Sequence, residues 1–202
     1  MAKVALIGAS GNAGSRILAE LLARGHEVTA IARHPEKIAP RTGVTAVAGD
    51  VLDPALAEVL RGHDAVISTV PFIDSNPKRL VAAVRAAGVA RYLVVGGAGS
   101  LQVAPGQLLI LQPDFLPEWR PEAAAGFAFL EYLRQVADLD WTYLSPAAWF
   151  HPGERTGTFR LGKDELIAND NGSAISFEDY AVALVDEVET PRHIRARFSV
   201  GY

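Results

Sequence analysis

The chain has 202 residues, of which 50% are hydrophobic and 21% are charged, and its formal net charge is −4. This length supports one domain with one sizeable core, and the scattered Lys and Arg residues give no basic surface for a nucleic acid. Because the chain has no cysteine, disulfides, thiol catalysis, iron–sulfur clusters and Cys-ligated zinc are excluded.

The apolar pattern at the start of the chain predicts a protein that does not insert into membranes. Met1 leads directly into the first expected strand, without a signal peptide, and no apolar run is long enough to span a bilayer. We therefore expect a cytoplasmic location. The five histidines are far apart and show no metal-ligand spacing, so no metal site is predicted: His26, His34, His63, His151 and His193.

Residues 4–16 predict a strand, a tight turn and a helix. An apolar run over residues 4–7 ends in Gly8-x-x-Gly11-x-x-Gly14, and an amphipathic helical pattern follows. Gly8 lets the backbone leave the strand sharply, Gly11 lets a pyrophosphate approach the main chain, and Gly14 lets the helix sit close to the strand. The helix start would face the phosphates. A dinucleotide site is predicted, which includes Ser10, Asn12 and Ala13; a tight turn without a ligand is the alternative.

Strands and helices alternate over the next 130 residues. We expect strands at 26–32, 44–48, 65–70, 92–95 and 141–144, and helices at 54–60, 77–87 and 121–136. Such alternation implies a parallel sheet with both faces covered. The chain has no internal repeat, low-complexity segment or linker, so residues 1–202 are expected to form one domain.

The pattern changes after Pro146. Residues 156–161 and 165–168 are expected to form short strands, and the run 169–172 is a strong turn signal. Ser176, with Asp179 three residues later, predicts the start of a helix. A last strand is expected at 197–202.

The chain resembles the extended and atypical branches of the short-chain dehydrogenase/reductase superfamily. The resemblance runs nearly end to end, and its most specific pieces are Gly8–Gly14, Gly49-Asp50 and the runs 94–100 and 141–146. Within the superfamily it is similar to small NmrA-like and flavin-reductase-like proteins that are labelled NAD(P)H-binding. This resemblance implies a Rossmann-like, doubly wound α/β fold whose residues 145–202 form a small α/β extension over the substrate side.

The end of the second strand predicts which cofactor binds. NAD enzymes place an Asp or Glu there for the ribose 2′-hydroxyl, whereas this chain has no acid at 31–34. Arg33 offers a planar fork of donors that suits a 2′-phosphate, and Asn12 and His34 could assist. We therefore predict NADP(H) over NAD(H), with a solvated Arg33 as the alternative.

Other cofactor contacts follow from the resemblance. It implies that Asp50 accepts from the adenine amino group and that Val51 packs on the adenine; Asp50 could instead cap the following turn. Thr69, Val70 and Pro71 should pass beside the nicotinamide ribose, although the last two could be plain core packing. Main-chain groups of three residues should meet the nicotinamide carboxamide: Ser145, Pro146 and Ala147.

The proton-transfer groups of the superfamily are absent. Its standard members carry Tyr-x-x-x-Lys on a helix and use a serine after the fifth strand. Here these places fall near Ala123, Phe127 and Gly97, and none of the four lysines lies on the 121–136 helix. Alcohol dehydrogenation, epimerisation and dehydration are therefore disfavoured.

Direct hydride transfer from NADPH to a flavin such as FMN or FAD, a quinone or a similar planar acceptor is the predicted function, because such acceptors can take a proton from water. A non-catalytic NADP(H)-sensing protein is the first alternative. A NAD(P)-dependent epimerase or isomerase is the second.

Candidate acceptor-site residues come from loops at the carboxyl ends of strands. Gly97, Ala98 and Gly99 could admit a flat ring, and Ser100 could donate a hydrogen bond, unless they form a plain turn. The long 101–120 connection suggests a lid, on which either of its two carboxylates, Asp114 or Glu118, could relay a proton. Three aromatic residues are also expected in the pocket, although Trp119 and Trp149 could equally be buried packing: Phe72, Trp119 and Trp149.

Overall fold

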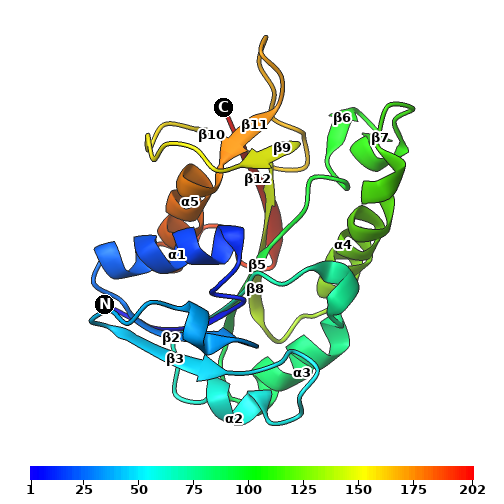
Figure 1. The fold of residues 1–202 in the computed structure, drawn as a ribbon. Helices are drawn as coiled ribbons and strands as arrows, with labels where there is room; N and C mark the ends of the chain where they lie inside the picture. Colours follow the sequence, from blue (N-terminus) through cyan, green and yellow to red (C-terminus); the bar gives the residue numbers. More distant parts are fainter.

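The computed structural model covers residues 1–202 and contains a central eight-stranded sheet in the order β10-β12-β8-β5-β4-β1-β2-β3. All neighbouring strands are parallel except β10, which runs antiparallel to β12. The Rossmann-like, doubly wound fold is confirmed (Figure 1). The strands are β1 Lys3–Ile7, β2 Glu27–Ala32, β3 Val44–Ala48, β4 Ala65–Ser68, β5 Arg91–Val95, β8 Asp140–Pro146, β10 Arg160–Gly162 and β12 Ala196–Gly201.

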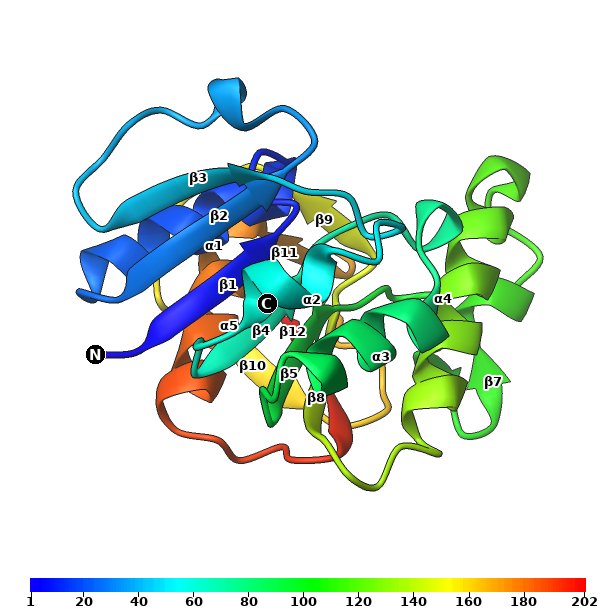
Figure 2. The same ribbon diagram turned by 90° about the horizontal axis from the view of Figure 1, so that it is seen from below.

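Helices cover both faces of this sheet. On one face α1 (Asn12–Ala23) and α5 (Phe177–Glu189) pack side by side, and on the other lie α2 (Leu56–Leu60), α3 (Pro77–Ala86) and α4 (Arg120–Leu133) (Figures 1 and 2). Each strand in the middle of the sheet therefore contributes side chains to two hydrophobic cores. In β1, residues 4 and 6 belong to the core under α1 and α5, and residues 5 and 7 to the other. This explains why the strands are continuous apolar runs.

The strand order reverses at β1. The chain runs outward from β1 through β2 to β3, then crosses to β4 and continues outward through β5 and β8 to β12. The loops after β1 and β4 consequently leave the sheet in opposite directions. A crevice opens between them at the carboxyl edge, which is where open α/β sheets bind ligands.

The carboxy-terminal extension differs from its predicted strands. Only residues 160 and 161 of the expected 156–161 strand form one, as the start of β10, and residues 165–168 form only an isolated bridge, between Glu165 and Gln102. The backbone at 156–157 is instead tied to α5, because Gly157 N donates to Asp179 Oδ1 at 2.7 Å. A small parallel pair, β9 (Trp149–His151) and β11 (Ala174–Ser176), was not predicted.

The expected start of α5 is confirmed. Ser176 Oγ accepts from the backbone N–H of Asp179 at 2.9 Å, as an N-cap residue does. The expected boundaries of other elements shift by a few residues; for example, α4 ends at Leu133 rather than at residue 136. No helix of the structure is both long enough and apolar enough to cross a membrane.

The long connection after β5 is ordered. It forms a hairpin of β6 (Gln102–Ala104) and β7 (Gln107–Leu108), followed by two short 3-10 turns, η3 (Leu109–Leu111) and η4 (Pro117–Trp119). Its base is joined to the extension, since Gln102 N donates to Asp164 O at 2.8 Å and Leu166 N donates to Gln102 O at 2.8 Å. The connection and the extension therefore flank the same edge of the sheet (Figure 1).

Candidate functional site

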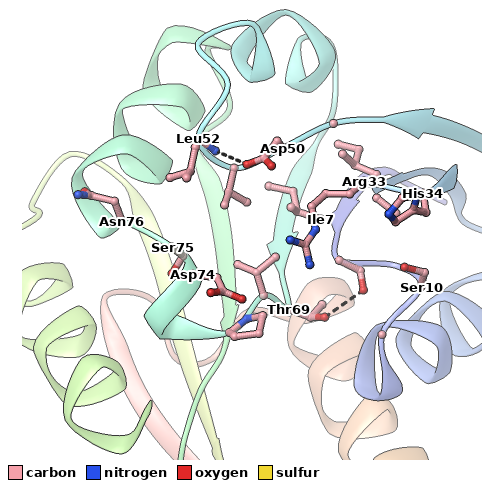
Figure 3. A pocket seen from close by; sticks show the side chains of 18 of the residues that line it. Ile7, Ser10, Arg33, His34, Asp50, Leu52, Thr69, Asp74, Ser75 and Asn76 are labelled. Carbon is pink, nitrogen blue, oxygen red and sulfur yellow. Dashed lines mark hydrogen bonds between the residues drawn. The ribbon is translucent and has the colours of Figure 1, made fainter. Parts of the chain in front are cut away.

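A cavity of about 750 Å³ opens at the carboxyl ends of β1, β2, β3 and β4, at the point where the strand order reverses (Figure 3). Residues that follow all four strands line it, so segments far apart in the sequence meet here. Ten of the predicted cofactor contacts are among the lining residues: Gly8, Ser10, Gly11, Arg33, His34, Asp50, Val51, Thr69, Val70 and Pro71.

The glycine turn has the geometry that its spacing implied. Gly8 has φ +84°, a conformation that favours glycine. A Cβ on Gly14 would lie 2.1 Å from Gly8 O, so only glycine lets α1 come this close to the end of β1. Gly11 is exposed and lines the cavity. Thr69 Oγ1 donates to Gly8 O at 3.3 Å and joins the turn to the end of β4 (Figure 3).

The start of α1 is open to an anion. Gly11 is the N-cap residue and supplies no side-chain cap, and the first turn holds no acidic residue. Asn12 and Ala13 belong to this first turn, while Gly14 is buried against the strand. Free N–H groups and the positive end of the helix dipole therefore face the cavity side of the turn.

Three basic side chains lie just after the end of β2. Figure 3 shows Arg33 extending into the cavity, and its guanidinium has no hydrogen-bond partner within the chain. His34 Nδ1 lies 3.2 Å from a carboxylate oxygen of Glu36, and both side chains are exposed. Lys37, from the 3-10 turn η1 (Pro35–Lys37), also lines the cavity. No acidic residue of this segment lines it.

Asp50 caps a turn. Its Oδ1 accepts from the backbone N–H of Leu52 at 2.8 Å (Figure 3), as the alternative interpretation proposed. The carboxylate still lines the cavity, next to Val51 and Leu52. Arg79 donates to Leu52 O at 3.1 Å and so closes the cavity at its α3 end.

Sequence reasoning missed a group of lining residues. Five of them follow β4 or belong to the start of α3, and the loop before Pro77 was the signal that could have found these five, because β4 delivers its carboxyl end to the same edge as β1. Asn76 caps α3 by accepting from the backbone N–H groups of residues 78 and 79. The missed residues are Lys37, Gly49, Leu52, Ile73, Asp74, Ser75, Asn76 and Arg79, with Ile7, Ile31 and Ala32 at the cavity floor.

Two expected acceptor contacts are core residues instead, so these predictions were wrong. Phe72 is only 8% exposed, and its ring packs on Phe129 and Tyr143 with centroids 5.3 and 5.9 Å apart. Gly99 is buried, and a Cβ there would lie 2.7 Å from Ala123 Cβ. Gly99 therefore allows α4 to approach the loop, rather than admitting a flat ring.

The candidate proton-transfer residues lie outside the cavity. Ser100 is 4% exposed, and its Oγ lies 3.4 Å from the buried Arg197 guanidinium, so the prediction that it donates to an acceptor was wrong. Asp114 is exposed, between η3 and η4. The structure does not bring the two together with the lining residues of the cavity.

The loop after β5 is held by a buried tyrosine. Tyr143 Oη accepts from Gly97 N at 3.1 Å and donates to Gly126 O at 3.1 Å. Burial raises the pKa of Tyr143 well above its usual range, so the hydroxyl stays protonated. Ala98 is half-buried in this loop. Ser145 and Pro146 end β8 and Ala147 follows it. The side chains of all three are buried, which leaves only their main chain for a ligand.

The remaining aromatic candidates are at the surface. Trp119 is 57% exposed before α4, and Trp149 is 65% exposed on β9. The Trp149 ring stacks on His151 with centroids 4.0 Å apart. Phe150, between them in sequence, packs on Phe177 and points the other way. Trp149 is therefore available to a ligand, whereas Phe150 is core.

Comparison with known proteins assigns the family. Residues 8–191 match the model of a family described as NAD(P)H-binding. This chain belongs to the NAD(P)H-binding family. It is 41% identical to the uncharacterized protein YwnB of Bacillus subtilis, over 98% of this chain and 97% of that protein.

Solved structures of similar proteins agree with this assignment. A proposed epimerase from Bacteroides thetaiotaomicron is 45% identical, with a TM-score of 0.94 over 99% of this chain and 96% of that one. A proposed NADH-flavin reductase from Streptococcus pneumoniae is 36% identical, with a TM-score of 0.83 over 100% and 99%. An oxidoreductase-like NAD(P)-binding fold is therefore shown.

The residues present fit a nicotinamide dinucleotide. The glycine turn leaves room for a pyrophosphate at the open start of α1, and the cavity extends to both β3 and β4. On the acceptor side, this member of the family lacks the Tyr-x-x-x-Lys pair on α4, since Ala123 and Phe127 occupy the places near which it is expected. The structure thus provides residues that fit the cofactor, but it lacks the Tyr-x-x-x-Lys pair that would transfer a proton.

Proposed function

We propose that the protein binds NADPH in this cavity and reduces a flavin, a quinone or a similar planar acceptor by direct hydride transfer. The observation that carries the proposal is the end of β2, where Arg33, His34 and Lys37 line the cavity and no acidic residue of that segment does. A 2′-phosphate is a dianion that an arginine fork binds well, whereas a ribose 2′-hydroxyl calls for a carboxylate.

The proposal gives a task to each part of the cavity and to several groups outside its lining. The turn at Gly8–Gly14 and the open start of α1 hold the pyrophosphate, and Asp50 and Val51 border the adenine. Thr69 to Pro71 pass beside the nicotinamide ribose, and the main chain at 145–147 meets the carboxamide. Trp149, Trp119, Gly97 and Ala98 are left to contact the acceptor.

The absence of the superfamily's Tyr-x-x-x-Lys pair from α4 supports a planar redox acceptor. When bound, NADPH supplies a hydride, which carries two electrons and one proton, and the acceptor takes its second proton from water. Positioning is then the main task of the chain. The name of the Streptococcus pneumoniae relative, a proposed NADH-flavin reductase, agrees with a flavin acceptor but names the other cofactor.

The test is NADPH oxidation, followed by its absorbance, with FMN, FAD and a small quinone as separate acceptors. We expect a steady rate that depends on enzyme concentration and is higher with NADPH than with NADH. No rate above buffer with any of the three acceptors would contradict the proposed activity. NADPH binding without such a rate would instead favour the alternative of a non-catalytic NADP(H) sensor.

An epimerase is a second candidate, because the 45% identical Bacteroides thetaiotaomicron protein is described as a proposed epimerase. This candidate predicts a tightly held cofactor that is regenerated in each turnover, so no net NADPH oxidation would accompany product formation. It also needs a positioned base, and neither Ser100 nor Asp114 lies among the lining residues of the cavity. The oxidation assay therefore separates it from the reductase.

A further inference from the structure

One wall of the cofactor cavity is the segment between β4 and α3. Of residues 69–76, all but Phe72 line the cavity. The segment is tied to the sheet only at its start, where Thr69 N donates to Ile7 O at 2.9 Å, and Asn76 at its end caps α3. Between these two points the wall needs another support if it is to keep its shape.

That support comes from α4. The backbone N–H of Phe72 donates to Glu122 Oε1 at 2.7 Å, and the next N–H, of Ile73, donates to Glu122 Oε2 at 3.0 Å. Each carboxylate oxygen thus takes one donor from the start of the 3-10 turn η2 (Phe72–Asp74). Hydrogen bonds to an ionised acceptor are about twice as strong as neutral ones.

The side chain of Phe72 adds a second attachment. A Cβ on Gly126 would lie 2.8 Å from the Phe72 ring, so the ring occupies a gap on α4 that only glycine leaves. Phe72 therefore faces α4 while its neighbours Pro71 and Ile73 line the cavity. Any displacement of Glu122 would move the wall on which the cofactor lies.

We propose that Glu122 is a positioning residue for the nicotinamide cofactor, which it serves by fixing the 71–74 wall without touching the ligand. The inference rests on the proposed function, because it requires NADPH in this cavity. Glu122 lies one residue before Ala123, the place where the superfamily carries its tyrosine. The start of α4 thus shapes the cofactor site here, and supplies no proton-transfer group to it.

The first experiment compares Glu122→Gln with Glu27→Gln. The amide that replaces the Glu122 carboxylate can accept only one of the two N–H groups, while Glu27 is exposed at the start of β2, outside the cavity, and makes no side-chain hydrogen bond. For Glu122→Gln we expect the Kd and KM for NADPH to rise roughly tenfold, about the loss of one charge-assisted hydrogen bond, with kcat unchanged at saturating NADPH. The control variant should match the wild type in all three.

A purely structural role for Glu122 gives a different pattern. Fewer folded molecules would lower kcat and the melting temperature and leave the Kd and KM for NADPH unchanged, and that result would overturn the inference. If the wild type itself binds no NADPH, the proposed function fails first. If the wild type binds and Glu122→Gln binds equally well, only the inference fails.

A second measurement needs no variant. Amide hydrogen exchange at Phe72 and Ile73 is measured in the wild type with and without NADPH. We expect NADPH to slow exchange at both amides several-fold, because the ligand holds the wall onto Glu122. Exchange at these two amides that does not respond to saturating NADPH would contradict the proposed role, even if Glu122→Gln does not fold.

Discussion

The cofactor edge and the acceptor side of the molecule are built in different ways. Around the cofactor cavity, strand ends and one helix start place the groups, and the glycine turn leaves little freedom to the backbone. Around the acceptor side, a hairpin, two short 3-10 turns and a partly irregular extension do so. We therefore expect that specific polar and charged contacts determine binding in the first region. In the second region, the shape of the surface is expected to matter most.

Charged groups show the same contrast. At the end of β2, Arg33 has no hydrogen-bond partner in the chain and faces the cavity. Beyond β5, two carboxylates are occupied by donors of the fold: Glu122 holds two backbone N–H groups, and Asp179 accepts from Thr156, Gly157 and Tyr202. We propose that the free charge on the cofactor edge binds a ligand, whereas these carboxylates hold loops together.

The largest expected effect is on the cofactor edge. Gly14→Ala would put a Cβ 2.1 Å from Gly8 O, and overpacking of this kind against backbone costs about 3 kcal/mol or more. We expect the melting temperature to fall by roughly 10 °C and NADPH binding to be lost. Gly88→Ala is the control, because an alanine at its φ of +73° would be strained but its Cβ would meet nothing within 4 Å. Equal losses in the two variants would contradict the close packing.

Arg33→Ala tests whether the unpaired Arg33 guanidinium recognises the 2′-phosphate of NADPH. Loss of charge-assisted hydrogen bonds to a 2′-phosphate should weaken NADPH binding about 10- to 100-fold and leave NADH binding nearly unchanged, as measured by fluorescence titration. Arg41→Ala, which removes an exposed arginine outside the cavity, should change neither affinity. Equal weakening of both cofactors by Arg33→Ala would show that this arginine does not recognise the phosphate.

Arg155→Ala tests a carboxylate that supports the extension. Hydrogen bonds from Arg155, joined by Arg24, outweigh burial and hold the pKa of Glu20 below its usual value of 4.5. A lowered pKa stabilises the fold above that value, and the stabilisation is lost as the pH falls through the folded pKa. We expect the variant to be about 1 kcal/mol less stable at neutral pH, a drop of roughly 3 °C.

The difference between Arg155→Ala and the wild type should shrink as the pH falls from about 5 to about 3. Arg192→Ala, which removes an exposed arginine without side-chain hydrogen bonds, is the matched control and should show no such pH dependence. A difference that stays constant across this range would mean that the Glu20 contact does not contribute in this way.

The smallest effect is expected on the acceptor side. Asp114→Asn should leave the rate of NADPH oxidation within about twofold of the wild type, because Asp114 is exposed and lies outside the cavity. A rate that falls by a factor of about 100, within the range typical of a lost general acid or base, would show that the 101–120 segment closes over the acceptor and brings this carboxylate to it.

These two regions also differ in how well the sequence predicted them. The glycine turn, the alternation of strands and helices, and the place of Arg33 follow from local constraints, since a positive φ or a strand end needs only neighbouring residues. Phe72 and Ser100 were misplaced because Phe129 and Arg197, distant in sequence, bury them. Glu122 gave no signal either, because its partners lie 49 and 50 residues away.

The most direct test of the account is a parallel titration of NADPH and NADH into the wild-type protein, followed by nucleotide fluorescence or by the shift in melting temperature. The account predicts saturable binding of both, with NADPH at least tenfold tighter, as one charge-assisted contact to a 2′-phosphate implies. Tighter binding of NADH, or no response to either nucleotide at millimolar concentration, would contradict it.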